Sequence, residues 1–286
     1  MEKLFINPVP KSNKCKADLS QDNQFVKKQN TTQNISGPSP IGILWDSVNY
    51  SCAYDTLFSI LSNIHSEDFR YWTSVYRQIT PHLQNLSKGC INLQSNNNLT
   101  LEIIRNQIRS NLYNENPEKF PYGQVGTNII ELAYAMLVDN NSLSTQTITC
   151  TYCNSNSVNS LSDILIHLYN NFDNINKGFQ YWQKHEGHKC NICQSQQTIT
   201  RNISNSYNLF AFALEHSNIA INKTVQVQKP NNSFSLIPLK GIIYIGNNHF
   251  TARIIDAKKM YSFIIVYLQE KLIDMKKVYQ HLLKRN

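Results

Sequence analysis

The 286-residue chain lacks any run of eighteen apolar residues, so no membrane-spanning helix is expected. Its first fifteen residues, MEKLFINPVPKSNKC, contain neither an apolar core segment nor a small-residue cleavage site, so they are not expected to act as a secretory signal. Both absences predict an intracellular protein of the cytoplasm or nucleus with no membrane partner. Hydrophobic residues still make up 41% of the chain, which predicts a folded globular protein.

An excess of positive charge is missing from the middle of the chain, although the formal net charge is +8. Lys and Arg outnumber Asp and Glu by three in residues 1–36 and by five in residues 257–286, whereas residues 37–256 carry fourteen of each. A nucleic-acid-binding protein is expected to carry a basic stripe on a folded face. The distribution therefore argues against nucleic acid as a partner, while a basic tail stays open.

The folded part of the chain is expected to be organised around the stretch from Trp45 to Ile64. Its apolar residues have the spacing of one buried helix face: Ala53, Leu57, Ile60, Leu61 and Ile64. Asn49 and Ser51 are good helix caps, so Cys52 is expected in the first turn. A helix N-terminus favours a thiolate over a thiol, which makes Cys52 a candidate nucleophile. The alternative is that Cys52 is a small buried hydrophobe, as most lone cysteines are.

The remaining patterns predict helices first and strands later. Helices are expected at residues 66–79, 99–113 and 127–139. Turns are expected in the KGC and SNNN segments around Cys90, and LSDILIHLYNNF (residues 161–172) could form a further helix. An antiparallel sheet is expected from the short apolar runs Tyr207–Leu214, Ile219–Val227, Phe234–Ile237, Gly241–Ile245 and His249–Ile255. The last two runs, joined by GNN, predict a hairpin.

Two Cys-x-x-Cys pairs, Cys150 with Cys153 and Cys190 with Cys193, are separated by 36 residues. Four thiolates in two tight turns match a closed, tetrahedral zinc site, which would stabilise the fold without taking part in catalysis. The alternatives are two unrelated pairs or a redox disulfide. His185 and His188 could each replace a cysteine as ligand, but are expected to flank the site.

A thiolate needs a base, and His249 is the best placed of the eight histidines. It opens a predicted strand directly after a turn, where its ring would project from the sheet edge towards a helix packed on that sheet. A cysteine at a helix start and a histidine on a late strand make up the papain-like arrangement.

Three motifs in this order resemble those of the ubiquitin-specific proteases, a family of papain-like deubiquitinases. NYSCAYDTLFSIL resembles the cysteine box, the four cysteines resemble the zinc-bearing fingers, and LKGIIYIGNNHFTARII resembles the histidine box. YNLFAFAL resembles the strand before that box. The boxes WDxxxYSCAYD and HFTARIID are similar to a divergent fungal group associated with transposable elements.

The resemblance implies an α+β fold: a papain-like cysteine protease with a helical lobe, an antiparallel β lobe and a fingers-like zinc-knuckle insertion. The catalytic domain would span residues 37–256 with the insertion at 145–200, preceded by a flexible polar arm (1–36) and followed by a basic, divergent segment (257–286) without closing strands. The resemblance also implies Cys52 as nucleophile, His249 as base and structural Zn²⁺. The expected substrates are conjugates of ubiquitin or a ubiquitin-like modifier.

The sequence departs from the family at three places. Ser47, with Asn49 nearby, stands where the family has the Asn that helps to hold the oxyanion, and Asp55 stands where an Asn is usual. No Asp or Asn lies between Asp256 and Asp274 to orient His249. Two other hypotheses therefore stay open: a catalytically impaired module that binds a ubiquitin-like protein, and a zinc-dependent nucleic-acid-binding protein of a mobile element.

Overall fold

The computed structural model describes residues 42–95, 98–138, 144–161, 165–168, 172–203, 209–214, 219–228, 233–246, 249–255 and 263–268, the last range by its backbone alone. All belong to the larger of two compact units of the chain, Pro40–Asn286. The described helices are α1 (Cys52–Glu67), α2 (Phe69–Ile79), α3 (Pro81–Leu93), α4 (Leu101–Glu115), α5 (Ile129–Leu137) and α6 (Ile175–Gln183). None of them is long and apolar enough to span a membrane.

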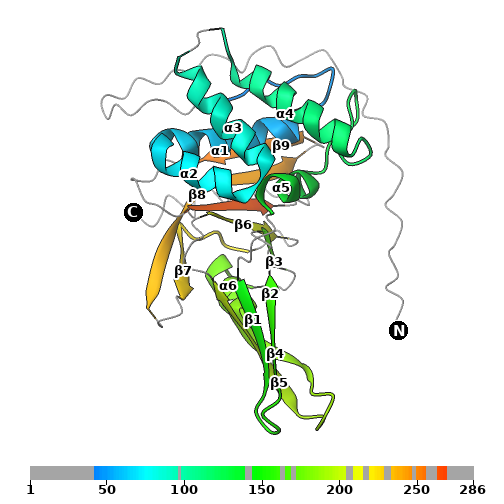
Figure 1. Ribbon diagram of the computed structural model, residues 1–286, viewed down its shortest axis with the longest axis vertical. Helices are drawn as coiled ribbons and strands as arrows, with labels where there is room; N and C mark the ends of the chain where they lie inside the picture. Colours follow the sequence, from blue (N-terminus) through cyan, green and yellow to red (C-terminus); the bar gives the residue numbers. More distant parts are fainter. Residues whose placement is uncertain are drawn as a thin grey trace. The chain divides into compact units, whose positions relative to one another are not determined.

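The described strands form two sheets (Figure 1). They are β1 (Ser144–Cys150), β2 (Asn156–Leu161), β3 (Leu165–Leu168), β4 (Lys184–Lys189), β5 (Gln196–Ile203), β6 (Leu209–Leu214), β7 (Thr224–Gln228), β8 (Phe234–Gly246), β9 (His249–Ile254) and β10 (Phe263–Leu268).

Helix α1 is the centre of the helical part, and thirteen of its sixteen residues are buried. It contacts α2, α3, α4 and α5 as well as strands β8 and β9. Gly241 in β8 allows this close approach, because a Cβ atom there would lie 2.6 Å from side-chain atoms of Ile60. The predicted helix with Cys52 in its first turn is therefore confirmed, with Cys52 as its first residue.

Two expectations about the other helices are wrong. Helix α2 starts after Asp68, whose carboxylate accepts the N–H of Tyr71, and not at Ser66, because α1 continues to Glu67. The KGC segment (residues 88–90) lies in helix α3, where a turn was expected, whereas the described residues of SNNN, 95 and 98, lie in turns beyond its end. Its Gly89 serves close packing, because a Cβ atom there would lie 2.7 Å from the side chain of Ile104 in α4.

The larger sheet has the order β3-β6-β10-β8-β7, with β9 paired to β8. The predicted hairpin is confirmed, with His249 opposite Gly246 at its closed end. Strands β7 and β9 are antiparallel to β8 as expected, but β3, β6, β10 and β8 run parallel, so the sheet is mixed. The expectation that no strand follows residue 256 is wrong, because β10 lies between β6 and β8.

Strand β8 contains two runs that were expected to be separate strands, Phe234–Ile237 and Gly241–Ile245. It passes through Pro238, which is the last residue of β8 paired with β7. Beyond it, β8 pairs with β10 from Leu239 and with β9 from Gly241. A proline is tolerated in a strand where its missing N–H coincides with an interruption of the ladder, here a change of partner strand.

The smaller sheet is antiparallel throughout, in the order β2-β1-β5-β4, and carries the four predicted metal ligands at its hairpin turns. The helix expected within 161–172 is wrong: residues 165–168 form strand β3, whose apolar side chains are buried beside β6. The helix of this region is α6 instead, which contacts both sheets. Helical part, β part and four-cysteine insertion confirm the expected α+β class.

Candidate active site and metal centre

Cys52 is buried, with 8% of its surface exposed. Its thiol is approached by the backbone N–H groups of Ala53 and Phe250. Phe250 follows His249 in β9, which packs against α1. The packing of α1 on β9 therefore places the Cys52 thiol against the peptide group that follows His249.

His249 is half-buried, and its ring meets the ring of Trp45 edge-on with centroids 5.2 Å apart. Trp45 belongs to the entry segment (residues 42–51), which leads into α1. The structure thus brings the two predicted catalytic residues onto packed elements from opposite ends of the described chain. It adds an aromatic contact to the histidine that sequence reasoning missed.

Burial acts on the titration of both groups. It raises the pKa of the Cys52 thiol, an effect opposed by the N–H groups of Phe250 and Ala53 and reinforced by the charge of Asp55. Burial also lowers the pKa of His249, against the charge of Asp55. Both shifts favour a neutral thiol beside a neutral imidazole, so burial opposes the thiolate that the helix start was expected to favour.

Asp55 lies one turn into α1 and takes part in a buried ion pair. Its carboxylate accepts hydrogen bonds from Ser51 Oγ (2.5 Å) and from Arg105 Nη1 (2.6 Å). The same Arg105 nitrogen also donates to the carbonyl of Leu44 at 2.7 Å. Arg105 therefore ties α4 to both α1 and the entry segment.

Sequence reasoning missed this role of Arg105, although the helix pattern contains a signal for it. Arg105 is 3% exposed and lies four residues after Leu101 and three before Ile108, both on the buried face of α4. A cation at such a position needs a buried partner, and Asp55 is that partner.

The two residues considered for the oxyanion are placed differently from each other. Ser47 is exposed. The Asn49 amide donates to the Asp46 carboxylate (2.9 Å), and its carbonyl accepts the N–H of Gly123 (3.1 Å). Asn49 is thus engaged in holding the entry segment together. Asp256 and Asp274, which flank the stretch where an orienting residue for His249 was expected and not found, lie outside the described residues.

The two Cys-x-x-Cys pairs form knuckles of the same backbone geometry, residues 150–155 and 190–195. The N–H of Cys150 donates to the carbonyl of Ser155, and that of Cys190 to the carbonyl of Ser195. The residue after each second cysteine, at positions 154 and 194, has positive φ (54° and 61°). Antiparallel pairing of β1 with β5 joins the two knuckles into one site.

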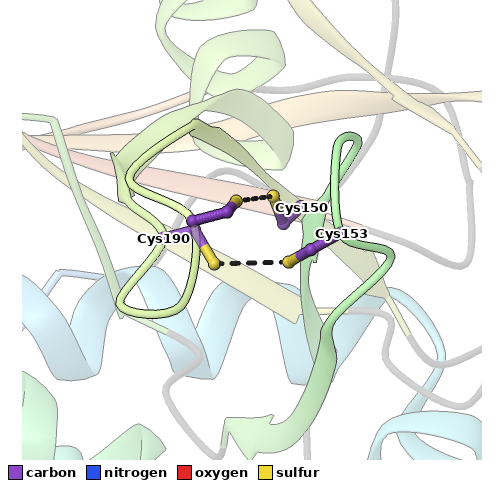
Figure 2. Close-up of side chains that lie close together, drawn as sticks. Cys150, Cys153 and Cys190 are labelled. Carbon is purple, nitrogen blue, oxygen red and sulfur yellow. Dashed lines mark hydrogen bonds between the residues drawn. The ribbon is translucent and has the colours of Figure 1, made fainter.

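The four Sγ atoms fit a tetrahedral metal ion. All lie within 4.8 Å of one another, and Figure 2 shows Cys150, Cys153 and Cys190 directed toward a common centre. Zn–S bonds of about 2.3 Å would place tetrahedral sulfurs about 3.8 Å apart. The separations Cys150–Cys193 (3.4 Å) and Cys153–Cys190 (3.6 Å) lie near this value and far above a disulfide bond.

The histidines near the knuckles are not part of this cluster. Among the described residues, the metal-capable group at this site contains the four cysteines and no histidine. His185 stacks on Tyr181, and its Nδ1 lies 3.0 Å from the carbonyl oxygen of that residue. His188 is exposed. Four thiolates without an open position are the donor set of a structural metal site.

No protein-family model and no curated protein matches the chain. The structure is similar to a chain of the SAGA Ubp8/Sgf11/Sus1/Sgf73 DUB module bound to ubiquitin aldehyde, with a TM-score of 0.49 and 13% identity over 77% of this chain and 63% of that one. For the yeast SAGA DUB module with a mutant Sgf73, the TM-score is 0.39 and the identity 14%, over 71% and 58% of the two chains.

A third similar structure is the catalytic unit of Neurospora crassa Pan2, with its protease and nuclease domain (TM-score 0.27, 11% identity, 76% and 43% of the two chains). The chain thus spans less than two thirds of the length of each of the three. These likenesses concern the fold and give no evidence of activity. The fungal, transposon-associated group stays a prediction from the sequence boxes.

Proposed function

We propose that the protein is a thiol-dependent hydrolase that removes ubiquitin or a ubiquitin-like modifier from other proteins. The observation that carries this proposal is the placement of Cys52: it opens a buried helix, and its thiol lies against the peptide joining His249 to Phe250. A nucleophile beside a base held on a second element is the arrangement required for covalent catalysis.

In the proposed reaction, Cys52 Sγ attacks the carbonyl carbon of the isopeptide or peptide bond while His249 takes the thiol proton. N–H groups of the first turn of α1 would stabilise the oxyanion that forms. The C–N bond then breaks, and the imidazolium gives its proton to the leaving amine. Water, deprotonated by His249, hydrolyses the thioester, which releases the modifier with a free carboxylate and restores the thiol.

The four knuckle cysteines would hold a zinc ion whose role is to stabilise the insertion. Zinc supplies binding energy that is coupled to folding, and a four-thiolate site leaves no position for water or substrate. Cys150, Cys153, Cys190 and Cys193 would be its ligands, and the chemistry at Cys52 does not involve it.

A second candidate function is binding without turnover. Burial raises the pKa of Cys52, and Asn49 donates its amide to Asp46. Both observations favour slow or absent hydrolysis by a protein that retains the fold. A kinetic measurement separates this candidate from an active hydrolase.

The deciding experiment is reaction of the full-length protein with ubiquitin carrying an electrophile at its C-terminus, followed by mass spectrometry. A single adduct at Cys52 supports the proposed function. Cys52→Ala is the negative control, and Cys90→Ala is the matched control, because Cys90 is also buried with a raised pKa but lies in α3. An adduct that persists in Cys52→Ala would refute the assignment of the nucleophile.

Turnover and binding are measured in parallel. Hydrolysis of a ubiquitin conjugate by the wild-type protein indicates an active enzyme. Binding of ubiquitin to a folded, zinc-loaded protein that forms no adduct indicates the second candidate. Absence of both would direct the same pair of assays to other ubiquitin-like modifiers.

A further inference from the structure

The imidazole of a general base must be held in one orientation to exchange protons with the nucleophile. A histidine ring turns about two side-chain bonds, so a neighbouring group has to fix it. Among the described residues, Asp55 is the carboxylate whose charge acts on His249. However, the Asp55 oxygens accept hydrogen bonds from Ser51 and Arg105.

Trp45 is the residue with a direct ring contact to His249. The two rings meet edge to face, with an interplanar angle of 78°. Such aromatic pairs have a preferred geometry and an energy beyond the burial of their surface. Because Trp45 is 53% exposed, its side chain contributes little to the core, and the contact with His249 is its main described interaction.

The backbone on both sides of Trp45 is held by hydrogen bonds. Leu44 donates its N–H to Glu102 Oε1 at 2.9 Å and accepts at its carbonyl from Arg105 Nη1 at 2.7 Å. Asp46 donates its N–H to Ser51 Oγ at 2.8 Å. Helix α4 thus holds one flank of Trp45, and the residue before Cys52 holds the other.

We infer that Trp45 is a positioning residue that keeps the His249 imidazole oriented toward Cys52, and that Glu102 and Arg105 hold Trp45 in place through the backbone of Leu44. This inference rests on the proposed function, because it requires that His249 serve as the base for Cys52. It assigns to an aromatic ring part of the role that an orienting carboxylate has in other cysteine and serine hydrolases.

The test measures alkylation of Cys52 by iodoacetamide in the full-length protein, located by peptide mass, across the pH range in which histidine titrates. The probe needs no ubiquitin, so it reports on the Cys52–His249 pair alone. His249→Ala defines the part of the rate that depends on the histidine. Trp45→Ala is expected to lower that part about two- to tenfold, the factor that corresponds to one edge-to-face pair.

Conservative variants separate positioning from a general loss of structure. Trp45→Phe keeps an aromatic ring and is expected to retain most of the histidine-dependent rate. Glu102→Leu removes the acceptor for the Leu44 N–H and should lower the rate, but by less than Trp45→Ala. Glu102→Gln keeps an acceptor oxygen and should leave the rate unchanged. Val48→Ala is the matched control, because this exposed side chain lies in the same segment.

The outcomes distinguish the inference from the proposed function. Equal pH profiles for Trp45→Ala and wild type, with a reduced rate in His249→Ala, would overturn the inference alone, as would equal losses in Trp45→Ala and Val48→Ala. A wild-type profile that is independent of His249 would overturn both. The expected alkylation pattern without any reaction with the ubiquitin electrophile would support the inference and overturn only the choice of modifier.

Discussion

The protein uses cysteine in two regions that differ in how their geometry is specified. In the knuckles, four thiols lie within 4.8 Å of one another. Each pair lies in its own six-residue turn, and the two turns have the same hydrogen bond. At the start of α1, the buried Cys52 thiol lies against a peptide group of β9, while α4 binds Asp55 and the entry segment contacts His249. The first site is defined by local turns and one strand pairing, and the second by the packing of several elements.

This difference has a thermodynamic side. The knuckle thiols lie close to hydrogen-bond donors and to one another. Their arrangement is therefore favourable once they are ionised and bound to a metal. The Cys52 thiol is buried in a way that raises its pKa, so its ionised form is unfavourable until a proton acceptor is aligned. Changes at the knuckles should therefore affect stability, whereas changes at Cys52 should affect reactivity.

The largest effect is expected from removal of the metal. Chelation, or Cys153→Ser, should unfold the four-stranded sheet, because a structural zinc site contributes about 10–16 kcal/mol of binding energy that is coupled to folding. Metal content by elemental analysis and hydrogen exchange of β1 and β5 amides measure this effect. Cys90→Ser is the control, and a metal-free protein with unchanged melting would contradict the prediction.

For the nucleophile we expect a large effect on activity and a small effect on stability. Cys52→Ala should abolish turnover, a loss on the order of 10⁶-fold by analogy with removal of a serine-protease nucleophile. Its free energy of unfolding should change by no more than about 1 kcal/mol, since only one sulfur atom is lost from the core. Kinetics on a ubiquitin conjugate and urea unfolding test both halves, and residual turnover in the variant would disprove the assignment.

An effect of intermediate size, on stability, is expected when the ion pair between Arg105 and Asp55 is broken. Arg105→Ala leaves the buried Asp55 carboxylate without its cation and should destabilise the protein by about 3–5 kcal/mol. The double variant Arg105→Met with Asp55→Asn removes both charges and should recover much of that loss. Urea unfolding compares the two proteins. Equal stability of both variants would mean that the pair carries no such penalty.

The smallest effect concerns the pH dependence of catalysis. His249 must be neutral to accept a proton, and burial lowers its pKa, so activity should persist below about pH 6.5, the ordinary histidine value, and fall as pH drops through the lowered pKa. Because the pKa of Cys52 is raised, alkylation in His249→Ala should rise only above about pH 8.5.

Zinc content is measured at each pH, because protonation of the knuckle thiolates would release the metal. An acid limb of kcat/KM at or above the ordinary histidine pKa, in protein that keeps its metal, would contradict the prediction.

The features that the sequence predicted are those with a local signature. Spacing alone identified the four metal-capable cysteines, the helix beginning at Cys52 and the hairpin closed at His249. A short-range pattern was misleading at Gly89, which suggested a turn. This residue lies within helix α3, where its missing side chain makes room for Ile104.

The remaining features depend on contacts between distant segments. The Arg105–Asp55 pair joins α4 to α1, and the Trp45–His249 contact joins the two ends of the described chain. Strand β10 was missed although its sequence, FIIVYL, is rich in the β-branched and aromatic residues typical of strands. Only its place between β6 and β8 depends on distant segments. No periodicity within a single window reports such contacts.

The position of β10 has a consequence for how the protein folds during synthesis. Among the described strands β10 is the last in the chain, yet it lies between β6 and β8. Until residues 263–268 leave the ribosome, both of those strands present unpaired edges to the cell. We therefore expect the nascent chain to depend on chaperones until residues 263–268 have been translated and β10 can pair with both strands.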